Sequence, residues 1–119
     1  MSSLPRLLQE EHTHTFVLRP AWILPTGDGS GFIGRSPNGR GHTIHWSSWG
    51  HKQARGTGTV WIENAHLTAY PYPGKIVATS PVDGHFTRLS AHYVKNGNRK
   101  TWGMRLERSG SFYDWQPIE

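Results

Sequence analysis

Residues 86–107 read FTRLSAHYVKNGNRKTWGMRLE, and at their centre is the dipeptide Asn96-Gly97. Asn-Gly between two segments of alternating apolar and polar residues predicts a two-residue β-hairpin turn, because both turn positions of a type I′ turn need positive φ. A type I′ turn places Lys95 opposite Asn98. The register of the two flanking strands follows from that pair.

This register separates an apolar face from a polar face. The predicted pairs are Leu89 with Met104, Ala91 with Trp102 and Tyr93 with Lys100 on one face, and Arg88 with Arg105, Ser90 with Gly103 and His92 with Thr101 on the other. A hairpin that covers a core on one side needs this division. The turn chemistry and the side-chain pattern therefore predict the same hairpin.

A second turn at Ser109-Gly110 extends the hairpin into a three-stranded meander. It would place Leu106 opposite Tyr113, Met104 opposite Trp115 and Arg105 opposite Asp114. The predicted core residues of the meander are Leu89, Ala91, Trp102, Met104, Leu106, Tyr113 and Trp115.

Working outward, short apolar segments separated by turn residues predict an all-β fold of seven to eight short strands. The expected architecture is a small barrel or a strongly curved antiparallel sheet, formed by a single β domain over residues 1–119. Residues 1–11 are expected to form a short N-terminal helix or arm, with the helix over residues 3–11. In the middle of the chain we expect a strand over 42–48, a flexible basic loop over 50–58 and an extended connection over 65–74.

The composition limits the classes of function. The 119 residues include six Trp and no Cys, which excludes disulfides, thiol catalysis and Cys-ligated metals. The N-terminus has no apolar stretch typical of a signal peptide, and no segment has the roughly 20 apolar residues of a membrane span. We therefore expect a soluble cytoplasmic protein without membrane contact.

The charge favours an anionic partner. The formal net charge is +5, and every charged residue between Asp28 and Glu63 is positive. Trp49 should follow the 42–48 strand and lie exposed beside the basic loop, where its ring could stack on a base. The predicted nucleic-acid-binding residues are Arg35, Arg40, Trp49, His51, Lys52, Arg55, Arg88 and Arg105, with Lys95, Arg99 and Lys100 extending this surface near the hairpin tip.

The Arg88–Arg105 pair has two interpretations. Like charges opposite each other on neighbouring strands are unfavourable, so an anion should lie between them. That anion is either Asp114 on the third strand, which gives the pair a structural role, or a phosphate of a bound ligand.

Eight histidines are present, three of them in HTIHWSSWGH, residues 42–51. Alternation along the strand puts His42 on the core side with Ile44 and Trp46, and His45 on the other side. If the chain is an enzyme, His45 and His92 could act as general base and acid on RNA, with Arg88 and Arg105 stabilising the phosphorane.

A metal site is a further possibility for the histidines. The spacing of His12 and His14 would allow metal binding, but no carboxylate cluster completes a site. We expect no metal and no cofactor.

Three functions remain open. The first is a non-catalytic module that binds single-stranded or structured nucleic acid. The second is a protein-interaction module, such as a small inhibitor or an assembly subunit. The third is a small histidine-dependent ribonuclease or phosphodiesterase. The absence of a recognisable catalytic motif favours a non-enzymatic role.

Overall fold

The computed structural model describes residues 3–26, 31–36, 38–63, 66 and 68–118, and this part of the chain forms β-strands without a helix. The strands are β1 (Leu7–Leu8), β2 (Phe16–Val17), β3 (Gly31–Ile33), β4 (His45–Trp49), β5 (Gln53–Glu63), β6 (Ala69–Val82), β7 (His85–Lys95), β8 (Asn98–Ser109) and β9 (Phe112–Pro117). The all-β prediction is confirmed. The described residues form nine strands rather than seven or eight, and β6 alone has 14 residues.

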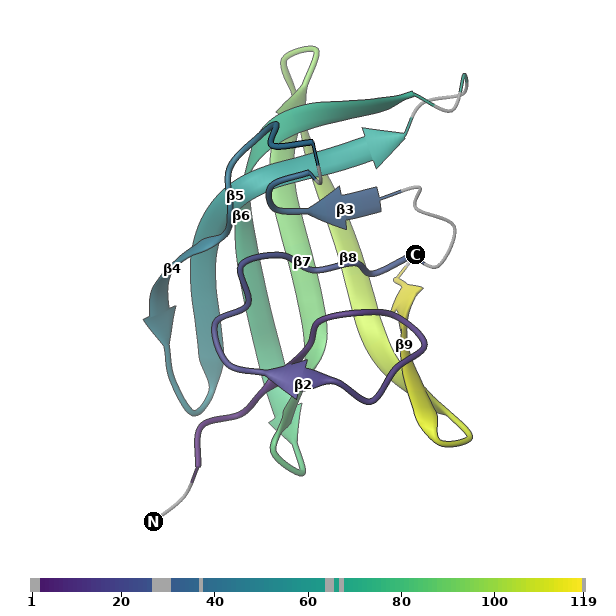
Figure 1. The fold of residues 1–119 in the computed structure, drawn as a ribbon. Helices are drawn as coiled ribbons and strands as arrows, with labels where there is room; N and C mark the ends of the chain where they lie inside the picture. Colours follow the sequence, from purple (N-terminus) through teal and green to yellow (C-terminus); the bar gives the residue numbers. More distant parts are fainter. Residues whose placement is uncertain (1–2, 27–30, 37, 64–65, 67, 119) are drawn as a thin grey trace.

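Seven strands form one antiparallel sheet that curls into a half-barrel (Figure 1). The order is β3-β5-β6-β7-β8-β9, and β4 joins the same edge of β5 as β3. β1 and β2 pair only with each other, and the N-terminal segment that contains them crosses one face of the curled sheet (Figure 1).

The meander at the C-terminal end has the predicted first turn. Asn96 and Gly97 have φ values of 53° and 77°, as a type I′ turn requires. All the cross-strand pairs predicted for this hairpin are present, from Lys95–Asn98 to Arg88–Arg105. The hairpin prediction is therefore confirmed in both turn and register.

The second turn was predicted one residue too early. Ser109 pairs with Phe112, so Gly110 and Ser111 form the turn. Every pair between β8 and β9 consequently moves by two residues, and Arg105 faces Gln116 instead of Asp114. A shift of two preserves which face each side chain occupies, because side chains alternate with period two.

The predicted loop over residues 50–58 is wrong, because most of it belongs to β5. In β5 small residues alternate with polar ones: Ala54, Gly56 and Gly58 lie on the core side, and Arg55 lies on the solvent side. These small residues allow β4 to approach closely, since a Cβ added at Gly56 would lie 2.8 Å from the His45 carbonyl oxygen. The glycines here serve strand packing rather than loop flexibility.

The predicted connection over 65–74 is largely strand as well. β6 begins at Ala69 and pairs with β5 through Pro71 and Pro73. Its pairing with β7 begins only at Gly74, so the prolines lie where β6 has a neighbour on one side alone. Proline is tolerated at such a position because no ladder hydrogen bond is lost.

The predicted N-terminal helix is also wrong. Leu7 and Leu8 form the short strand β1, which pairs with Phe16 and Val17 of β2, and both leucines are fully buried. The backbone of Arg6 instead exchanges hydrogen bonds with the β6–β7 hairpin, accepting from Phe86 N–H and donating to the Gly84 carbonyl. The two leucines enter the core from an extended segment.

Trp49 is buried, contrary to the expectation of an exposed loop residue. The register of β4 shifts between Trp46 and Ser48, and this extra residue turns Trp49 to the core side. Its indole N–H donates to the Pro5 carbonyl at 2.9 Å, and its ring meets Phe86 edge-on. Trp49 is therefore not available to stack on a ligand.

Candidate nucleic-acid interface

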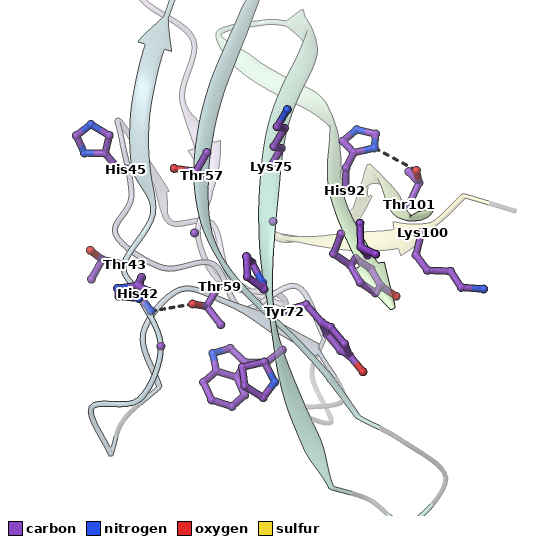
Figure 2. A pocket seen from close by; sticks show the side chains of 18 of the residues that line it. His42, Thr43, His45, Thr57, Thr59, Tyr72, Lys75, His92, Lys100 and Thr101 are labelled. Carbon is purple, nitrogen blue, oxygen red and sulfur yellow. Dashed lines mark hydrogen bonds between the residues drawn. The ribbon is translucent and has the colours of Figure 1, made fainter. Parts of the chain in front are cut away.

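An open groove of about 1240 Å³ is lined by residues of β4 to β8 and by the segment 40–43 (Figure 2). Four of the side chains lining it are Lys or Arg and three are His: Arg40, Lys75, Arg99 and Lys100, with His42, His45 and His92. No Asp or Glu occurs among its described lining residues. The groove therefore combines cations with an absence of carboxylates.

The cations of the groove are not neutralised within the described part of the chain. The ion pairs found there are His12 with Asp114 and Arg105 with Glu107, and neither involves a groove residue. Unpaired positive charges in a shared concavity reinforce one another and attract anions. Within the described residues, the Lys and Arg side chains of the groove thus have no carboxylate partner.

Five groove residues lie directly beside one another on five neighbouring strands. His45 pairs with Thr57, Thr57 with Lys75, Lys75 with His92, and His92 with Thr101. All five are exposed, and Figure 2 shows them side by side across the sheet. We call this set the donor row, because each member carries an N–H or O–H group.

His92 is held in place by two hydroxyl groups. Its Nε2 lies 3.2 Å from Ser90 Oγ, and its Nδ1 lies 3.1 Å from Thr101 Oγ1. Ser90 precedes it on β7 and Thr101 faces it from β8. The imidazole is therefore oriented by both of its neighbours.

Aromatic side chains border the groove. Arg40 lies over the Trp61 ring at 5.7 Å, and the Trp61 N–H donates to the Gly34 carbonyl at 2.9 Å, so this ring is already occupied. Tyr72 and Tyr93 lie with their ring centroids 5.2 Å apart and are half-buried. Burial, and to a smaller extent the neighbouring Tyr72, raise the pKa of Tyr93 above its usual value.

The rim at residues 40–43 is fixed to β5 by Thr59. The backbone N–H of His42 donates to Thr59 Oγ1 at 2.8 Å, and the Thr59 N–H donates to the His42 carbonyl at 3.3 Å. His42 itself is exposed, so its expected place on the core side was wrong. The alternation of the strand starts only at Ile44, which is buried.

The basic residues predicted from sequence do not form one site. Arg40 lines the groove, whereas Arg35 is tied to its own loop by a hydrogen bond from Nε to the Gly39 carbonyl. His51 and Lys52 lie exposed in the β4–β5 turn, and Arg55 lies exposed on β5 outside the groove lining. Only part of the predicted basic surface is brought together.

Arg88 and Arg105 face each other as predicted, but the carboxylate beside Arg105 is not the expected Asp114. Arg105 Nη2 lies 2.8 Å from Glu107 Oε1, and its Nε also donates to that oxygen at 3.0 Å. Asp114 faces Glu107 and lies 3.6 Å from His12 instead. Glu107, two residues along the same strand, therefore compensates the arginine pair.

The proposed catalytic pair is not assembled. His45 on β4 and His92 on β7 are separated by β5 and β6, which places their backbones roughly 14 Å apart for three strand spacings of about 4.8 Å. A general base and a general acid must both reach one phosphodiester within hydrogen-bond distance. Arg88 and Arg105 lie about four residues further along the strands, so they do not complete the set either.

Within the described ranges, no group of three or more His, Asp or Glu side chains is placed to hold a metal ion. The same residues contain no helix long and apolar enough to cross a membrane.

Several groove residues were not predicted as site residues, among them Lys75, Tyr72 and Tyr93. The signal that could have found Lys75 is its alternation with the apolar Ile76, directly after the segment predicted to be a connection. The tyrosines belong to the segment that was assigned to a connection. Only the strand order brings them near Arg99 and Lys100.

Comparison with protein-family models, curated proteins and solved structures found no match for this chain.

Proposed function

We propose that this protein is a non-catalytic binding module for single-stranded nucleic acid and that the groove is its binding site. The observation that carries the proposal is the set of four Lys and Arg side chains that line the groove without a described carboxylate beside them. Phosphates are the ligands that such a surface attracts most strongly.

A single strand fits this site better than a duplex. Proteins that bind single strands combine a positive groove, which follows the backbone, with aromatic side chains on which bases stack. Lys75 and Arg99 supply charge on the exposed face of the strands. Lys100 and the half-buried rings of Tyr72 and Tyr93 line the groove from the other face. Trp49 plays no part, since it is buried.

The test is fluorescence anisotropy with a labelled ten-residue oligothymidylate at low and high salt. If four phosphates are neutralised, the affinity should fall about 50-fold between about 50 and 200 mM salt. Lys75→Ala should weaken binding about fivefold and reduce the log–log salt slope by about 0.7, the value for one phosphate contact on a single strand.

Lys52→Ala is the matched control, because it removes the same charge from an exposed side chain outside the groove. We expect its affinity to stay within about twofold of the wild type. Equal losses for the two variants would show that net charge, rather than the groove, drives binding. Absence of binding at low salt would overturn the proposal and favour the protein-interaction module.

A further inference from the structure

The donor row defines a direction across the groove. Its members lie on β4, β5, β6, β7 and β8 in order, so the row runs at right angles to the strands. Four strand spacings of about 4.8 Å give it a length of roughly 19 Å. The row is therefore a line of hydrogen-bond donors and charges that is longer than any single side chain or mononucleotide.

The chemistry of the row suits a backbone with repeated phosphates. Lys75 stands at its centre, with Thr57 and His92 on either side. Hydroxyl and imidazole groups donate hydrogen bonds to phosphate oxygens, and an ammonium group adds charge. The Ser90 and Thr101 hydroxyls keep the His92 ring from rotating freely, which lowers the entropy lost on binding.

The other cations of the groove lie beside the row. Arg99 is two residues from Thr101 on the same face of β8, whereas Lys100 pairs with Tyr93 on the other face. Arg40 lies over Trp61, four residues along β5 from Thr57. A backbone that follows the row therefore meets Lys75 at its centre and Arg99 near its β8 end.

We propose that the donor row is the track of the phosphate backbone, so that the ligand is a short single-stranded segment of four to six nucleotides lying across the β-strands from β4 to β8. This inference rests on the proposed function. A stacked strand advances about 3.4 Å per nucleotide, so 19 Å holds about six, and an extended strand needs fewer. The lower bound of about four matches the smallest sites of single-strand-binding folds.

Competition by unlabelled oligothymidylates of two to twelve residues tests the length. Affinity should rise steeply up to four to six nucleotides. Beyond six nucleotides, the affinity should increase only in proportion to the number of positions at which the longer oligomer can occupy the row. A further rise of more than about tenfold from six to twelve nucleotides would contradict the inference, because the ligand would then extend well past the row.

The direction is tested at the β4 end of the row. His45→Ala should weaken binding of the six-residue oligomer about fivefold, which corresponds to a loss of about 1 kcal/mol. The control variant His51→Ala removes an exposed histidine in the adjacent turn and should leave the affinity for this oligomer unchanged. For the two-residue oligomer, which cannot span the row, the effect of His45→Ala should be smaller.

The two proposals can fail separately. One outcome is salt-dependent binding whose affinity is unaffected by His45→Ala and rises steadily with the length of the oligomer. This outcome would overturn the proposal that the backbone follows the donor row, but it would leave the groove as a nucleic-acid site. Failure of every oligomer to bind at low salt would overturn both.

Discussion

At the scale of single residues, the tryptophans link the sheet to other segments of the chain through hydrogen bonds of their indole N–H groups. Four indole N–H groups donate to backbone carbonyls outside the seven-stranded sheet: Trp46 to Pro20, Trp49 to Pro5, Trp61 to Gly34 and Trp115 to Leu8. A buried carbonyl without a partner costs about 1–3 kcal/mol. Four of the six tryptophans thus satisfy backbone carbonyls that the large sheet does not pair.

His85 is the residue at which we expect pH to act on stability. Its ring stacks on Phe16 with centroids 3.8 Å apart, and burial lowers its pKa below the ordinary 6.5, although Asp83 acts in the opposite direction. The unfolded chain therefore takes up a proton at this position before the folded chain does. Stability should fall as the pH drops through about 6.5, and His85 should have no effect well above that value.

The His85→Phe variant keeps the stacking and removes the titration. Urea unfolding at pH values between about 7.5 and 5.5 should give a flatter dependence of the unfolding free energy than in the wild type. His51→Phe, at an exposed position, should retain the wild-type slope. Identical slopes for wild type and His85→Phe would show that this histidine does not contribute.

At the scale of elements, the pairing of β5 with β4 requires small residues in β5. A Cβ added at Gly56 would lie 2.8 Å from the His45 carbonyl oxygen and 3.0 Å from the Trp46 ring, whereas one at Gly103 on β8 would meet only Ile118 at 3.8 Å. Gly56→Ala should therefore destabilise the protein by about 1–3 kcal/mol. Gly103→Ala should be neutral or stabilising by up to about 1 kcal/mol, because alanine loses less backbone entropy.

Chemical unfolding of both variants checks this prediction. Since each is a glycine-to-alanine change inside a strand, the intrinsic propensity effect cancels in the comparison. Equal stabilities would mean that β4 can move away from β5 without cost. In that case the His45 end of the donor row would not be rigidly placed.

The elements also show which parts of the fold local sequence can predict. The β7–β8 hairpin was predicted in full because Asn96-Gly97 fixes both turn and register within a few residues. The first half of β5, residues 53–58, was missed because its glycines were interpreted as flexibility, although their alternation with polar residues is the pattern of a strand. The extra residue in β4 and the burial of both Leu7 and Leu8 depend on tertiary packing, so no local pattern indicates them.

The candidate site was predictable to a smaller degree. Arg40 and the hairpin-tip cations Arg99 and Lys100 were recognised as part of a basic surface, but as separate regions. Their connection runs through Lys75, which depends on the pairing of β5 with β6 and of β6 with β7. Long-range strand order, rather than composition, creates the groove.

At the scale of the whole molecule, the N-terminal segment and the donor row occupy opposite faces of the curled sheet. The segment contributes Leu7 and Leu8 to the core cluster. The donor row alternates along the strands with core residues such as Ile76 and Ala91, and so lies on the other face. Stability and binding should therefore be separable by substitution.

Leu8→Ala tests this separation. Removal of a fully buried leucine should cost about 2–5 kcal/mol. The same change at Leu18, which is 38% exposed, should cost about 0.5 kcal/mol or less. Well below its unfolding transition, however, Leu8→Ala should bind the six-residue oligomer as tightly as the wild type, because the donor row is unchanged. A large loss of affinity in the folded variant would mean that packing of the N-terminal segment sets the curvature of the sheet and with it the spacing of the row.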